Sequence, residues 1–185
     1  IDNRGGLIQA DNALTLNAAS LDNSGTLGAA EAPPKGVLGK VVSIVADRVN
    51  NQAGSIEAIE DLALTAKELD NTGGEVASQG NASIVADTLE NAQGKVQAGK
   101  SLTVITQVLQ GLGMLESAGD LSFQYAGSLN QEGDIASGRD LNLSVGGAMD
   151  NRATITAARD LSITADSLNN QASGALLAGG VNTIK

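Results

Sequence analysis

Leu69-Asp70-Asn71-Thr72-Gly73-Gly74-Glu75-Val76-Ala77-Ser78 is the stretch that decides the fold, because its opening triplet recurs about every twenty residues. A unit of this size is too small to bury its own apolar residues. A fixed period of this kind is therefore typical of a solenoid, in which the units stack and share one core. The other clear copies of the triplet are Ile1-Asp2-Asn3, Leu21-Asp22-Asn23, Val49-Asn50-Asn51, Leu89-Glu90-Asn91, Met149-Asp150-Asn151 and Leu168-Asn169-Asn170.

Within each unit, apolar residues recur at every second position, which is the period of a β-strand and not of a helix. After the triplet comes a pair such as Val76/Ser78, and four residues further on a second run such as Ala82/Ile84/Ala86. In the second unit we assign the pair to Leu27/Ala29. Two short strands and a bend at the triplet close one coil. The sequence thus predicts an all-β parallel β-helix of about nine coils with about 20 residues per coil, and residues 1–185 form a single such segment.

The third residue of the triplet predicts a ladder of amide side chains. Equivalent residues of stacked coils lie about 4.8 Å apart, so they form a column along the axis. An amide both donates and accepts hydrogen bonds, and a column of asparagines can therefore bond along its own length. The column is interrupted at Gly111 and Gln131. The predicted ladder residues are Asn3, Asn23, Asn51, Asn71, Asn91, Asn151 and Asn170.

The composition favours a folded, elongated chain. Hydrophobic residues make up 42% of it, but with one Phe, one Tyr and no Trp the core must be built from Ala, Leu, Ile and Val. The formal net charge of -10 should repel phosphate backbones, so we expect no nucleic-acid partner. Cys and His are absent, and we expect neither a cofactor nor a metal. We find no apolar run of the roughly eighteen residues that a membrane span needs.

The second unit carries an insertion, and we expect residues 30–41 to leave the coil as a loop. Surface loops accept extra residues at low cost, which favours a tolerated insertion; the alternative is a loop that contacts a partner. Because the chain opens within a repeat, we expect it to be a segment of a longer array. The candidate contact residues are Pro33, Pro34, Lys35 and Lys40, with Tyr125 as a further candidate outside the loop.

The two aromatic residues, Phe123 and Tyr125, follow the stretch from Leu109 to Met114 in which the asparagine column lapses. Both fall at inward positions of a predicted strand. We interpret them as packing in a wider section of the core, since large apolar side chains at strand spacing usually pack; a ligand platform is the alternative.

Four aspartates stand just before the second strand of their units, at Asp61, Asp120, Asp140 and Asp160. Stacked carboxylates repel, so a cation such as calcium is one interpretation. We favour the other, in which each carboxylate accepts a backbone N–H of its own turn while Arg139 and the following Arg159 neutralise the stack.

Three segments share a recognisable pattern: Ile-Asp-Asn-Arg-Gly-Gly-Leu-Ile from Ile1 to Ile8, Leu-Asp-Asn-x-Gly-Gly-x-Val from Leu69 to Val76, and Gly-Arg-Asp-Leu-x-Leu from Gly138 to Leu143. These segments resemble the haemagglutinin repeats of the filamentous haemagglutinin family. The resemblance covers nearly the whole chain. It implies a right-handed parallel β-helix within a large exoprotein of Gram-negative bacteria, exported by two-partner secretion through a dedicated outer-membrane transporter.

We therefore expect a structural and adhesive stalk segment of a secreted surface filament, which contacts a receptor on a host or neighbouring cell. One alternative is the receptor-binding segment of a contact-dependent growth inhibition effector. The other is a polysaccharide lyase or hydrolase, with Asp120, Asp140 and Asp160 as its carboxylates. We expect no enzyme, because turn chemistry already explains these carboxylates.

Overall fold

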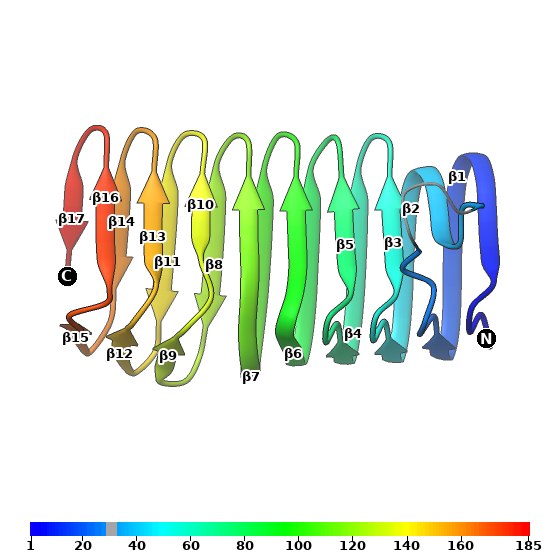
Figure 1. The fold of residues 1–185 in the computed structure, drawn as a ribbon, viewed down its shortest axis with the longest axis horizontal. Coiled ribbons are helices and arrows are strands. Elements are labelled where there is room, and N and C mark those ends of the chain that lie inside the picture. Colours follow the sequence, from blue (N-terminus) through cyan, green and yellow to red (C-terminus); the bar gives the residue numbers. More distant parts are fainter. Residues whose placement is uncertain (29–32) are drawn as a thin grey trace.

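The chain folds into an elongated stack of coils with its two termini at opposite ends (Figure 1). The computed structural model describes residues 1–28 and 33–185, and every regular element in that part of the chain is a β-strand. Viewed as in Figure 1, the chain rises along the front strands, passes over the top and descends behind them while it advances from N to C. This winding is right-handed, as the sequence resemblance implies.

The strands fall on two long faces and a corner. Besides β4 (Leu62–Asp70), which runs from the second face into the corner, four strands continue from one part of a coil into the next: β1 (Leu7–Asp22), β2 (Gly36–Asn50), β6 (Ala82–Ala98) and β7 (Leu102–Ser117). The first face is completed by β3 (Ser55–Ala58), β5 (Glu75–Ser78), β10 (Ile135–Ser137), β13 (Thr154–Ala157) and β16 (Ala175–Ala178). The second face is completed by β4 (Leu62–Asp70), β8 (Leu121–Tyr125), β11 (Leu141–Val145), β14 (Leu161–Thr164) and β17 (Asn182–Ile184). The corner carries the short strands β9 (Leu129–Gln131), β12 (Ala148–Asn151) and β15 (Ser167–Asn170).

All the strand pairs are parallel, and their register places equivalent residues of successive coils in columns. The column on the first face holds nine residues, which confirms the predicted parallel β-helix and its coil of about 20 residues. The backbone N–H and C=O groups of the interior strands are thereby paired with the coils on either side. The column consists of Ile8, Val37, Ile56, Val76, Val96, Leu115, Ile135, Ile155 and Leu176.

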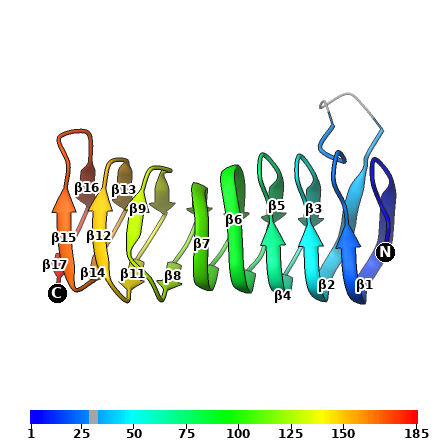
Figure 2. The same cartoon turned by 90° about the horizontal axis from the view of Figure 1, so that it is seen from below.

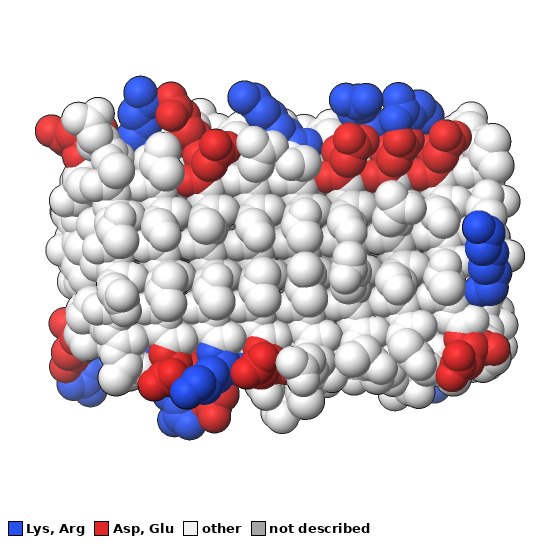
Figure 3. Space-filling model, turned by 180° about the vertical axis from the view of Figure 1, so that it is seen from behind, with Lys and Arg blue, Asp and Glu red and all other residues white. Residues whose placement is uncertain are grey.

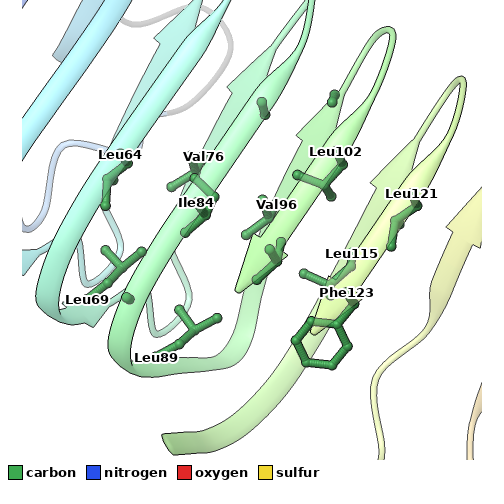
Figure 4. Packing of buried hydrophobic residues seen from close by; sticks show 14 of the residues in the cluster. Leu64, Leu69, Val76, Ile84, Leu89, Val96, Leu102, Leu115, Leu121 and Phe123 are labelled. Carbon is green, nitrogen blue, oxygen red and sulfur yellow. The ribbon is translucent and has the colours of Figure 1, made fainter. Parts of the chain in front are cut away.

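One apolar core runs along the inside of the stack, because the inward residues of both faces are leucine, isoleucine, valine and alanine. Figure 4 shows Leu64, Ile84 and Leu102 pointing between the two faces. Burying one such side chain stabilises the fold by about 1.5–3 kcal/mol. Phe123 is completely buried and Tyr125 is half-buried against the core, so both aromatic residues pack as expected.

The insertion in the second unit begins and ends earlier in the chain than predicted. Strand β2 begins at Gly36, and Val37 is fully buried between Ile8 and Ile56, whereas Leu27 is 44% exposed. The expectation of a loop over 30–41 is therefore wrong for residues 36–41, which are part of the coil. Leu27/Ala29 and Val37/Gly39 both match the strand period, and the burial of Val37 selects the second pair.

The extra residues are 27–35, between Thr26 and Gly36, of which 29–32 lie outside the described residues. Thr26 keeps the stack intact at this point. In the nearby coils the first N–H of the strand donates to a glycine carbonyl, as Glu75 N does to Gly54 O at 2.8 Å. Here Ser55 N donates to Thr26 Oγ1 at 2.9 Å, and the same hydroxyl donates to Asn23 O at 2.8 Å.

Candidate binding surfaces

The predicted asparagine ladder exists over the first part of the stack. Asn3 Nδ2 donates to Asn23 Oδ1 at 2.7 Å, and the same bond repeats from Asn23 to Asn51 at 2.8 Å, from Asn51 to Asn71 at 2.7 Å and from Asn71 to Asn91 at 2.7 Å. A further link joins Asn151 Nδ2 to Asn170 Oδ1 at 2.7 Å. The ladder is buried at all but its terminal residue Asn170, so it holds the corner together and offers no surface to a ligand.

The ladder asparagines up to Asn71 also donate to the backbone of the following coil, and the residues beside them are glycines because there is no space for a side chain. Asn71 Nδ2 donates to Lys95 O at 3.2 Å as well as to the next asparagine. A Cβ at Gly74 would lie 2.1 Å from Asn51 O and 2.7 Å from Asn71 Oδ1, which no side chain allows. The glycine of the repeat is therefore required by the close approach of the ladder.

The ladder stops at Asn91, because the next coil places Leu112 opposite it and not Gly111. The register shifts here, with Gly111 bulged out at a φ of 69° and Leu112 turned inward. The buried Asn91 Nδ2 consequently has no hydrogen-bond partner, and neither has the buried Oε1 of Gln131 on the far side of Leu112. The sequence could indicate an interruption here but could not show which residue would fill the column.

The residues expected to contact a partner do not form one site. Pro33, Pro34 and Lys35 are exposed and lead into β2 on the side that carries β3 and β5 (Figure 2). Lys40 lies within β2 and pairs with Glu60 at 3.2 Å. Tyr125 lies on β8, four coils further along the stack, or about 19 Å at the spacing of strands.

The aspartates before the second strand accept hydrogen bonds from backbone N–H groups of the next coil, so the prediction that each binds an N–H of its own turn is wrong. Asp61 Oδ1 accepts from Asn81 N at 2.8 Å, and Asp160 Oδ1 accepts from Val181 N at 2.9 Å. The N–H of Asn81 lowers the pKa of Asp61, and the guanidinium of Arg159 lowers the pKa of Asp140. Both carboxylates are therefore held in the ionised form. In the described part of the chain, no group of three or more His, Cys, Asp or Glu could hold a metal ion.

A groove of about 770 Å³ runs along the first face, over the first six coils. Its walls carry the carboxylates Asp11, Glu57 and Glu116, and no lysine or arginine lines it. Gln97 Nε2 donates to Glu116 Oε2 of the next coil at 3.0 Å. The groove arises where small residues such as Ala58 and Ala98 stack in a column, so it appears once the coils are placed in register.

The second face is uncharged over most of its length, with a Lys or Arg side chain at one end (Figure 3). Two residues per strand point outward from it, and their columns contain no charged residue from β1 to β14. Charged residues lie on the two rims that flank this face (Figure 3). The outward columns are Thr15, Ser43, Ala63, Ser83, Thr103, Ser122, Asn142 and Ser162, and Asn17, Val45, Thr65, Val85, Ile105, Gln124, Ser144 and Thr164.

The coil register, the shared core and the amide ladder define a parallel β-solenoid. A sequence model of the haemagglutinin repeat matches residues 1–32, 39–107, 101–153 and 117–185, and the chain belongs to this family of filamentous haemagglutinin repeats. No curated protein and no solved structure matches the chain. Among the described residues, no helix is long and apolar enough to cross a membrane.

Proposed function

We propose that this chain is a non-enzymatic stalk segment of a large secreted filament on a bacterial surface, which holds an adhesive or effector part of its parent protein away from the cell. The observation that carries the proposal is the unbroken column of nine inward residues along the first face. Each coil adds length and contacts the coils beside it, so the molecule is built to span distance.

Family membership supports the rest of the proposal. Haemagglutinin repeats are typical of secreted surface proteins, and we propose export by an outer-membrane two-partner secretion transporter and contact with a host or neighbouring-cell receptor. The aspartates considered for a polysaccharide-acting enzyme are engaged elsewhere. Asp140 is bound by Arg159, and Asp120 and Asp160 each accept a hydrogen bond from a backbone N–H of the next coil.

Removal of whole coils tests the stalk function. Deleting residues 62–101, which are two coils of 20 residues, joins Asp61 to Leu102 and keeps every column in register. We expect a folded rod that small-angle scattering shows to be about 10 Å shorter. The matched control deletes residues 62–91, which removes fewer residues but one and a half coils, and it should unfold. A compact wild-type particle, or equal tolerance of both deletions, would contradict the proposal.

A second candidate function is receptor binding in a contact-dependent growth inhibition effector, through residues 33–35. The observation that favours it is that Pro33, Pro34 and Lys35 are exposed at an insertion that leaves the coil register unchanged. Deleting residues 27–35 joins Thr26 directly to Gly36, just as the equivalent residues are adjacent in the regular coils. Loss of binding to target cells with an unchanged melting temperature would support this function, while unchanged binding would exclude the insertion as the contact.

A further inference from the structure

We propose that the uncharged second face, formed by the two outward columns defined above, is a lateral docking surface for a second copy of this chain. The charged residues of the molecule are 17% of the sequence, yet none occupies the sixteen positions of these columns. Uncharged, well-packed surfaces are typical of the centre of protein interfaces, where charged residues are depleted. This inference depends on neither the export nor the adhesion of the parent protein.

The face carries a strip of β-branched side chains over β2, β4, β6 and β7. Val45, Thr65, Val85 and Ile105 stand next to one another in one column, and Val45 and Val85 are 47% and 37% exposed. The neighbouring column presents short side chains, such as Ser83 and the adjacent Thr103. A strip of β-branched side chains flanked by small hydroxyl residues can pack against an identical strip with few voids, as the dry interfaces between stacked β-sheets do.

The spacing of the coils identifies the partner as a second copy. The face repeats at the strand spacing of about 4.8 Å, and a second face with the same repeat can align with it over the whole length. A second copy of this chain presents the same repeat over the same length. Self-association of one patch with its own copy is also the usual way in which closed dimers form.

The rims permit close approach despite the net charge of -10. Their charges pair along the same chain: Lys67 with Asp47 at 2.7 Å, and Arg139 with Asp120 at 3.6 Å. Arg159 binds Asp140 in the same way. When two faces meet, these paired charges on the rims therefore repel one another less than unpaired rows of like charge would.

The area predicts a weak dimer that strengthens with length. Eight stacked strands, each with two outward residues, cover about 520 Å² per copy, against about 800 Å² in a standard interface. Each added coil contributes about 65 Å² more at the same spacing. Association should therefore be detectable at high concentration in this chain and tighter in a longer array.

Sedimentation velocity of the whole chain over a concentration series, up to about 1 mM, tests the proposal. We expect reversible dimerisation of the wild type in the absence of any other molecule. The variant V85K/I105K places two lysines in the β-branched strip and should weaken the dimer at least tenfold. The control A77K/Q97K places two lysines on the first face of the same two coils, gives the same net charge and should dimerise like the wild type.

A wild type that stays monomeric at the highest concentration overturns the proposal and leaves the face to a different partner or to solvent. Equal weakening by both double variants also overturns it, because the effect would then follow net charge and not the face. Thermal melts confirm that each variant is folded. Should V85K/I105K not fold, S83K/T103K places the same charges on the neighbouring outward column and decides between the same two outcomes.

Discussion

The first half of the stack and the second half share one apolar core but hold the corner differently. In the first half, seven residues separate Leu62 from Leu69 and the backbone stays paired throughout, so β4 runs from the second face into the corner. In the second half, eight residues separate Leu141 from Met149, and Gly146-Gly147 interrupt the strand. The corner strands β9, β12 and β15 then form a small sheet of their own.

This difference is compensated within each coil. Val76 follows Leu69 by seven positions, whereas Ile155 follows Met149 by only six. The segment before the corner is thus one residue longer in the second half and the segment after it one residue shorter, so the coil keeps its length. The ladder changes at the same place, with four successive amide links up to Asn91 and one after Asn151. The apolar columns therefore set the coil length, and the amide ladder holds the corner as a separate contribution.

The largest expected effect tests whether the core is common to both halves. Leu143→Asp in the second half and Leu64→Asp in the first each place a charge at a buried position, where the native side chains are 2% and 0% exposed. We expect each to lower the free energy of unfolding by about 4 kcal/mol or more, measured by denaturant unfolding. A large loss in one half alone would break the claim of a shared core.

The next effect separates the two corners. Asn71→Ala removes a ladder link on each side and leaves the buried Nδ2 of Asn51 and Oδ1 of Asn91 short of a partner, at an expected cost of about 3 kcal/mol. Asn151→Ala breaks a single amide link and should cost about half as much. Equal losses in denaturant unfolding would show that the interruption of the ladder has no energetic consequence.

A smaller difference is expected in local opening. The coil from Leu109 to Met114 carries a bulge and faces an amide with no partner, whereas the equivalent residues 69–74 lie within the intact ladder. Backbone amides of residues 109–114 should therefore exchange with solvent about tenfold faster than those of 69–74. Native-state hydrogen exchange measures this, and similar protection in both segments would contradict it.

The smallest expected effect is a pH dependence at the exposed aspartates. The folded pKa of Asp61 is lowered by the N–H of Asn81 and that of Asp140 by Arg159, so the stability they contribute is present at neutral pH and is lost as the pH falls below about 4. Asp61→Asn in the first half and Asp140→Asn in the second should each flatten the fall of the melting temperature in acid. An unchanged acid profile for both variants would refute this.

The sequence predicted the features that repeat, because each is supported by several units. The strand period at Val76 and the column at Asn71 are examples, and both have the predicted partners in the structure. The errors fall where a single unit departs from the pattern. Leu27 and Val37 fit the strand period equally well. Leu112 takes the place of Gly111 in the asparagine column only because the backbone bulges, and no local sequence signal specifies that bulge.

Surface features could not be predicted for a different reason. The groove over Ala58 and Ala98 and the bonds from Asp61 and Asp160 to the next coil depend on which residues become neighbours once the coils are stacked. The expectation that each aspartate binds its own turn was reasonable for one coil taken alone. In a solenoid the nearest free N–H belongs to the coil above, and this follows from register and not from local sequence.

The hydroxyl of Thr26 allows extra residues to be inserted just before β2 without disturbing the stack. Because this side chain supplies the acceptor that the backbone of Ser55 needs, the chain is free to depart after Thr26 and return at Gly36 without a broken bond in the rod. A foreign epitope spliced between these two residues would be displayed on a rigid scaffold at a fixed height along the axis. Evolution and protein engineering could use the same junction to vary what the filament presents while its framework stays constant.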